Sequence, residues 1–187
     1  INGETESELM HTLGDVLASV FVLLPIENRS IGFTSWSRSF RNFVSALQSS
    51  KKIQVKKVVE LLGGVGQPAL QHLTSSATEN FARITDSEAI FLRVPGVVKS
   101  KEMRDVLTKN YSQTQKALSE FPTLDVAMVG IGSAEAKAYS VKDFNFFTDE
   151  QFQLARSKGA VAEINLRFID AQGKPVKTEL DNLVIGL

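Results

Sequence analysis

Three short apolar runs, each ending in a turn of small residues, constrain the fold of this 187-residue chain more than any other feature. The turns cover residues 33–37, 62–67 and 129–133, and helical patterns alternate with the apolar runs. Continuous apolar strands that alternate with helices are typical of a parallel sheet covered by helices on both faces. The sequence therefore predicts one α/β domain over residues 1–187, a three-layer fold with a mostly parallel sheet.

Local patterns assign the individual elements. Apolar residues at helical spacing predict helices over 4–24 and from 35 onward. Helices are also expected over 68–83 and, as a polar helix, over 100–119. Thr148 is placed to cap a further helix that ends at Ser157, with Gln151 completing a capping box. Strands are expected over 30–33, 55–62, 88–94, 124–131 and 160–169, and residues 178–187 are expected to be extended. Residues 170–173 read as a turn in which Gly173 takes a positive φ.

The three turns are the first candidates for a ligand site. The carboxyl ends of parallel strands line a common crevice, where ligands usually bind. Glycines there allow close approach of the backbone, and the amides at a following helix N-terminus favour an anion such as phosphate. The same glycines could instead serve only as tight turns. Glu163 is a carboxylate inside an apolar run and is costly to bury, so it either faces solvent or is held for a polar ligand.

Composition excludes several other classes. Lys plus Arg and Asp plus Glu both number 21, and this balance argues against a nucleic-acid surface on the chain itself. The apolar runs are too short to span a membrane, and the chain has no cysteine and no signal-peptide pattern, so we expect a cytoplasmic protein. The run 63–66 lacks the spacing of a dinucleotide fingerprint and a Walker lysine, and His11 and His72 have no second ligand at metal spacing. No cofactor or metal is therefore expected.

Residues 158–176 closely resemble the Gly-Ala-Val-(Gly/Ala)-(Asp/Glu) strand, with its Phe, Asp and glycine-turn sequel, of the SorC family of bacterial transcription regulators. Motifs at 31–36, 58–66, 91–96 and 125–133 agree with the same family in order and spacing. The resemblance implies an effector-sensing domain that is similar in fold to sugar-phosphate isomerases and has a Rossmann-like sheet. Such a domain binds a sugar or sugar phosphate and shifts the DNA affinity of its parent protein. DNA would be bound by a separate N-terminal helix-turn-helix domain. The chain is accordingly expected to be a fragment that lacks this segment and the family's final strand–helix unit.

The resemblance also implies the site residues. Thr34 and Ser35 would face the phosphate or hydroxyls of the effector, and Ser37 would add a further hydroxyl. Glu163 would accept hydrogen bonds from sugar hydroxyls, and the Trp36 ring either stacks on a sugar face or packs in the core. Gly63, Gly64 and Gly66 would form a loop beside the effector. Gly130 and Gly132, like Ser37, are candidates because they lie in the turns at strand ends, independently of the resemblance.

One departure from the family narrows the expected ligand. Leu62 stands where some members carry an arginine that holds a second phosphate, so a bisphosphate is not expected.

Two other functions remain open at this point. One is a sugar-phosphate isomerase or deaminase with Glu163 as general base, although no second acid–base group accompanies it in a recognisable motif. The other is a module that only mediates oligomerisation. We expect a homo-oligomer, because a missing strand would expose a sheet edge unless residues 10–24 or the segment around Phe146 cover it. The cluster Phe144, Phe146, Phe147 and Phe152 is assigned to the core, with a dimer surface as the alternative.

Overall fold

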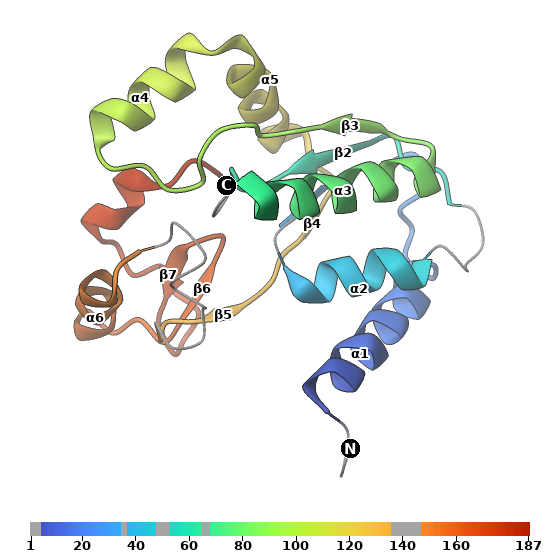
Figure 1. The fold of residues 1–187 in the computed structure, drawn as a ribbon, viewed down its shortest axis with the longest axis horizontal. Coiled ribbons are helices and arrows are strands. Elements are labelled where there is room, and N and C mark those ends of the chain that lie inside the picture. Colours follow the sequence, from blue (N-terminus) through green and yellow to red (C-terminus); the bar gives the residue numbers. More distant parts are fainter. Residues whose placement is uncertain (1–4, 35–36, 48–52, 65–67, 136–146) are drawn as a thin grey trace.

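A computed structural model describes residues 5–34, 37–47, 53–64, 68–135 and 147–187 (Figure 1). Its first sheet has four parallel strands in the order β3-β2-β1-β4. These are β1 (Ser30–Phe33), β2 (Lys57–Glu60), β3 (Glu88–Ile90) and β4 (Val126–Met128). All four lie within strands predicted from the sequence, and the parallel sheet with helices on both faces confirms the predicted fold class. No helix in the described ranges is long and apolar enough to cross a membrane.

One face of the parallel sheet is covered by α1 (Glu6–Phe21), α2 (Arg38–Leu47) and α3 (Pro68–Thr85). Aromatic packing dominates this layer: the rings of Phe33 and Phe40 stack with centroids 4.0 Å apart, and Phe21 meets Phe43 edge-on at 5.1 Å. Phe40, Phe43 and Leu47 are all buried on the sheet side of α2, as their helical spacing predicted. Trp36, expected on the same face, lies outside the described residues.

The opposite face is covered by α4 (Lys101–Asn110), α5 (Ser112–Glu120) and the short 3₁₀ turn η1 (Phe121–Thr123). The prediction of one helix over 100–119 is wrong, because Tyr111 is extended at φ −104° and ψ 110° and separates α4 from α5. Asn, Tyr and Ser have weak helix propensities, so a break at 110–112 costs little. The break lets α5 bury Thr114 and Ala117, while α4 buries no residue.

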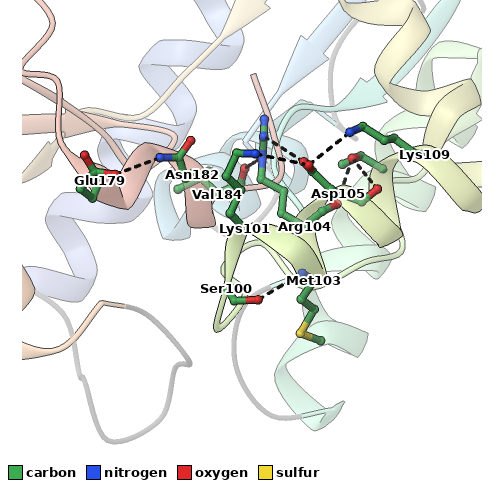
Figure 2. A network of polar contacts seen from close by, with 10 residues as sticks. Ser100, Lys101, Met103, Arg104, Asp105, Lys109, Glu179, Asn182 and Val184 are labelled. Atoms are coloured by element: carbon green, nitrogen blue, oxygen red, sulfur yellow. Dashed lines mark hydrogen bonds and ion pairs between the residues drawn. The ribbon is translucent and has the colours of Figure 1, made fainter.

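Contacts with the C-terminal segment hold α4 in place (Figure 2). The Arg104 guanidinium Nε donates to the Val184 carbonyl at 3.0 Å, and within α4 the Asp105 carboxylate lies between Lys101 at 3.5 Å and Lys109 at 3.2 Å.

The expectation of an extended stretch over 178–187 is wrong for η3 (Glu179–Leu183), a 3₁₀ turn that Thr178 caps. Beyond η3 the chain is extended and forms bridges to the loops that follow β2 and β3.

A second, antiparallel sheet consists of β5 (Gly132–Ser133), β6 (Ala162–Ile164) and β7 (Arg167–Ile169). Figure 1 shows the chain running from β4 directly into β5, which joins the two sheets. The prediction of one strand over 160–169 is wrong: Asn165 and Leu166 have φ values of 50° and 63° and reverse the chain in a two-residue turn. Two consecutive left-handed residues are the geometry of a type I′ hairpin, and asparagine accepts this conformation more readily than most residues.

The helix α6 (Asp149–Ser157) packs on the second sheet. It begins with the predicted Thr148–Gln151 capping box, and Gly173 takes the predicted positive φ in its turn, 75°. Phe147 and Phe152 are fully buried against Phe168, so the core assignment is confirmed for these two residues. Phe144 and Phe146 lie outside the described part of the chain.

Candidate functional site

Thr34 connects the carboxyl end of the parallel sheet to the second sheet. It directly follows β1, and its amide donates to the carbonyl of Met128, the last residue of β4, at 3.2 Å. Its side chain is only 3% exposed, and its hydroxyl donates to the carboxamide oxygen of Asn165 in the β6–β7 turn. The structure therefore places Thr34 against the hairpin that carries Glu163, which is 129 residues later in the sequence.

Ser37 caps the N-terminus of α2 next to this contact. Its Oγ accepts a hydrogen bond from the Phe40 amide at 3.4 Å, and its own amide faces the Thr34 carbonyl at 3.5 Å. Gly130 lies near Ser37, because a Cβ atom added to Gly130 would be 3.8 Å from the Ser37 Oγ. The first turn of α2 has no acidic residue, whereas α4 and α6 begin with Glu102 and with Asp149 and Glu150. No carboxylate of the first turn of α2 therefore neutralises the positive end of its dipole.

Glu163 and Asn165 form the hairpin side of this region. Glu163 is 2% exposed, pairs with Gly132 in the β5–β6 ladder, and its Oε2 accepts from the Leu166 amide at 2.5 Å. The sequence left two environments open for this carboxylate, solvent or a polar ligand. The prediction that it faces solvent is wrong, because Glu163 is buried. Asn165 was not among the predicted site residues, although asparagine tolerates the positive φ of a hairpin turn and could have indicated a turn within residues 160–169.

Gly63 and Gly64 lie in a tightly bonded loop after β2. The Gly64 amide donates to the Val94 carbonyl at 2.7 Å, and the Gly63 amide donates to the Ile185 carbonyl at 3.0 Å. A Cβ atom on Gly63 would come within 2.5 Å of the Val94 carbonyl oxygen, so only glycine fits there. Both amides therefore donate hydrogen bonds within the protein, as expected if these glycines serve only to form a tight turn. Ser35, Trp36 and Gly66 lie outside the described residues.

Glu60 is a second buried carboxylate, and no sequence motif indicated it. This residue ends β2 and is 6% exposed; its carboxylate accepts from the Thr78 hydroxyl at 2.8 Å and from the Leu92 amide at 3.0 Å. Burial raises the pKa of Glu60, and the two hydrogen bonds oppose that rise. The carboxylate joins β2 to α3 and to the chain that follows β3, which is a structural role.

Comparison with known proteins yields a consistent set of relatives. A family described as "Putative sugar-binding domain" matches residues 2–187. The sorbitol operon regulator of Klebsiella pneumoniae is 26% identical over 188 residues, which cover 100% of this chain and 58% of that protein. The deoxyribonucleoside regulator of Bacillus subtilis is 20% identical over 162 residues, which cover 87% of this chain and 50% of that protein. The chain thus spans little more than half the length of these relatives.

Solved structures show the same fold. The full-length sorbitol operon regulator SorC from Klebsiella pneumoniae superposes with a TM-score of 0.85 at 24% identity, covering 100% of this chain and 59% of that one. A DeoR family transcriptional regulator from Listeria monocytogenes superposes with a TM-score of 0.80 at 25% identity, covering 100% of this chain and 72% of that one. The resemblance to SorC-family regulators that the sequence motifs indicated is confirmed.

Proposed function

The chain belongs to the family of sugar-binding domains found in transcription regulators, and from this premise we propose that it binds a sugar or sugar monophosphate as the effector of such a regulator. The observation that carries the proposal is the contact of Thr34, which follows β1 at the carboxyl end of the parallel sheet, with Asn165 of the hairpin that also contains Glu163. Gly130 lies near Ser37 at the start of α2. These residues come from three separate parts of the sequence, and ligands of open α/β sheets bind at this edge.

The site divides into an anion end and a hydroxyl end. At the anion end, the amides of the α2 N-terminus and the Ser37 hydroxyl bind a phosphate, with Ser35 as a further donor. Gly130, which has no side chain, lets the phosphate approach Ser37. At the hydroxyl end, Glu163 accepts from the sugar, and Gly132 pairs with it in the ladder. On the family resemblance we also assign Gly63, Gly64 and Gly66 to the site, with the Trp36 ring stacking on a sugar face.

The effector acts on DNA binding through the parent protein. We propose that a separate N-terminal domain contacts DNA, that the parent is a homo-oligomer, and that effector binding shifts the equilibrium between its DNA-binding states. The edge strands β3 and β4 of the described sheet offer surfaces for such assembly. On this proposal the chain binds its ligand without converting it.

A ligand panel tests the binding proposal. Sorbitol, sorbitol 6-phosphate, ribose 5-phosphate and glucose 6-phosphate are titrated against the chain, with inorganic phosphate as a reference, and thermal unfolding is followed. A ligand at 100 times its Kd stabilises the folded state by about 2.7 kcal/mol. Ser37→Ala is expected to weaken binding of phosphorylated ligands selectively. Ser157→Ala, which removes an exposed hydroxyl at the end of α6, is the matched control and should bind normally.

Two outcomes contradict the proposal. Absence of any stabilisation across the panel would argue for the oligomerisation module instead. Conversion of a sugar phosphate, followed by NMR of the same mixtures, would favour the isomerase-like enzyme, and loss of that turnover in Glu163→Gln would identify the general base.

A further inference from the structure

We propose that Asn165 and Thr34 form a buried hydrogen-bonding pair that recognises one hydroxyl group of the sugar and does not contact its phosphate. This inference rests on the proposed function and extends it, because Asn165 becomes a specificity-determining residue of the same site. The sequence motifs implied Thr34 as a contact to either phosphate or hydroxyl; the pair assigns it to a hydroxyl.

The Asn165 carboxamide carries an unused hydrogen-bonding group. Asn165 is 3% exposed, and its carboxamide oxygen accepts the Thr34 hydroxyl proton. Among the residues that the structure describes, none accepts a hydrogen bond from the carboxamide nitrogen of Asn165. Buried polar groups in native proteins are nearly always paired, so a buried NH₂ group without a partner calls for one from outside the chain. A ligand oxygen supplies that partner.

The same carboxamide is held in position before a ligand arrives. Asn165 lies in the left-handed region at φ 50°, where the hairpin turn fixes its backbone. The next residue, Leu166, is 1% exposed within the core of the second sheet, and its amide is bonded to the Glu163 carboxylate. The turn is therefore anchored on its far side, and little conformational entropy is lost when its side chain binds a ligand.

The donor and acceptor pattern of the pair matches a hydroxyl group. A threonine hydroxyl has one proton, and Thr34 gives that proton to Asn165, so its oxygen can only accept a further hydrogen bond. The Asn165 nitrogen can only donate. A neutral sugar hydroxyl both donates and accepts, so one such group satisfies both partners. A phosphate dianion has no proton to donate to Thr34.

Replacement of Asn165 by glycine tests the pair. Glycine accepts the φ of 50° without strain and removes the whole carboxamide. Asn28→Gly is the matched control, because Asn28 also has a positive φ, 58°, but lies in an exposed turn before β1. Binding is measured by calorimetry with sorbitol 6-phosphate, ribose 5-phosphate and glucose 6-phosphate, with the monodeoxy analogues of each, and with inorganic phosphate.

The expected result is specific to one hydroxyl. Asn165→Gly should lower the affinity for the sugar phosphate that the wild-type chain binds by about tenfold, the value of one or two hydrogen bonds. It should leave unchanged the affinity for the one deoxy analogue that lacks the recognised hydroxyl, and the affinity for inorganic phosphate. Thr34→Val should show the same selectivity. If circular dichroism shows that Asn165→Gly is unfolded, the test is made with Thr34→Val alone.

The failures are distinguishable. If the wild-type chain binds none of the probes, the proposed function is refuted, and this inference with it. If the wild-type chain binds and Asn165→Gly binds equally well, only the inference is refuted. An equal loss of affinity for the parent sugar phosphate and all its deoxy analogues would mean that the pair shapes the site without reading a hydroxyl, which also refutes it.

Discussion

Leu166 provides the most direct test of the local geometry on which the site depends. Its φ of 63° lies in the left-handed region, where a side chain costs roughly 1–2 kcal/mol, yet the residue is a leucine. The side chain is 1% exposed and packs in the same cluster as Phe152, Phe168 and Val184. Burial thus offsets the strain, and the two contributions can be separated by comparing Leu166→Ala with Leu166→Gly.

The two variants should rank in an unusual order. Leu166→Ala removes the buried side chain and keeps the strain, so it should lower the free energy of unfolding by about 3–5 kcal/mol. Leu166→Gly removes the same packing but relieves the strain, so it should be no less stable than the alanine variant. Leu180 is the control, because it lies in the same cluster but within the 3₁₀ turn η3 and without a positive φ. There glycine should be about 1 kcal/mol less stable than alanine.

Equilibrium urea unfolding followed by circular dichroism measures all four variants. The informative quantity is the glycine–alanine difference at each position, because unequal packing losses at the two sites largely cancel within each pair. If glycine is about 1 kcal/mol less stable than alanine at both positions, Leu166 is not strained and the two-residue turn at 165–166 is wrongly described. The proposed preorganisation of Asn165 would then lose its basis.

Three further predictions concern stability. Burial raises the pKa of Glu60 in the folded state, so the folded protein binds this proton more tightly than the unfolded chain does. The free energy of unfolding should therefore fall as the pH rises from the ordinary glutamate pKa to the raised one, with a limiting slope of about 1.4 kcal/mol per pH unit. Glu60→Gln should flatten that part of the pH profile in urea titrations; an unchanged slope would contradict the assignment. Thr148→Ala should lose about 1 kcal/mol in urea unfolding because it removes the cap of α6, whereas Thr148→Ser should retain it; equal losses in both variants would count against the capping box. Asp105→Asn should change the unfolding free energy little at low salt and not at all in about 1 M salt, because its lysine partners are solvent-exposed; a loss that persists at high salt would show a larger role for the network in Figure 2.

The elements predicted from the sequence with the greatest accuracy carry a local signal. Ser30–Phe33 is a strand with the predicted bounds, and α6 begins at the predicted capping box. For α6 the deciding interaction joins the hydroxyl of Thr148 to the amide of Gln151, three residues later. This interaction can be predicted from neighbouring residues, so the start of α6 does not depend on the rest of the fold. For β1 the local signal is its short apolar run, although its hydrogen-bonding partners lie in the distant strands β2 and β4.

Two of the errors arose where two short elements of the same type follow one another. Residues 160–169 form an unbroken, mostly apolar run, and nothing in its hydropathy marks the reversal at Asn165 and Leu166. The helical pattern over 100–119 likewise continues through Tyr111, although the chain there is extended. The spacing of apolar residues indicates which face of a helix or strand is buried, but it does not indicate where the chain turns. The position of the turn depends on how the elements before and after it pack.

For the candidate site too, the features predicted from the sequence are local, and the features that the sequence did not predict depend on contacts between distant residues. The order of motifs along the chain was enough to identify the family and the parallel α/β architecture, because strand–turn–helix units leave their periodicity in the sequence. The contact between Thr34 and Asn165 joins residues 131 positions apart in two different sheets, and no local pattern encodes it. Whether Glu163 faces solvent or the interior was likewise decided by the hairpin, whose reversal turns the carboxylate toward the amide of Leu166. The sequence sets which side chains are available; the relative placement of the two sheets, which is determined by the packing of distant residues, decides which of them meet.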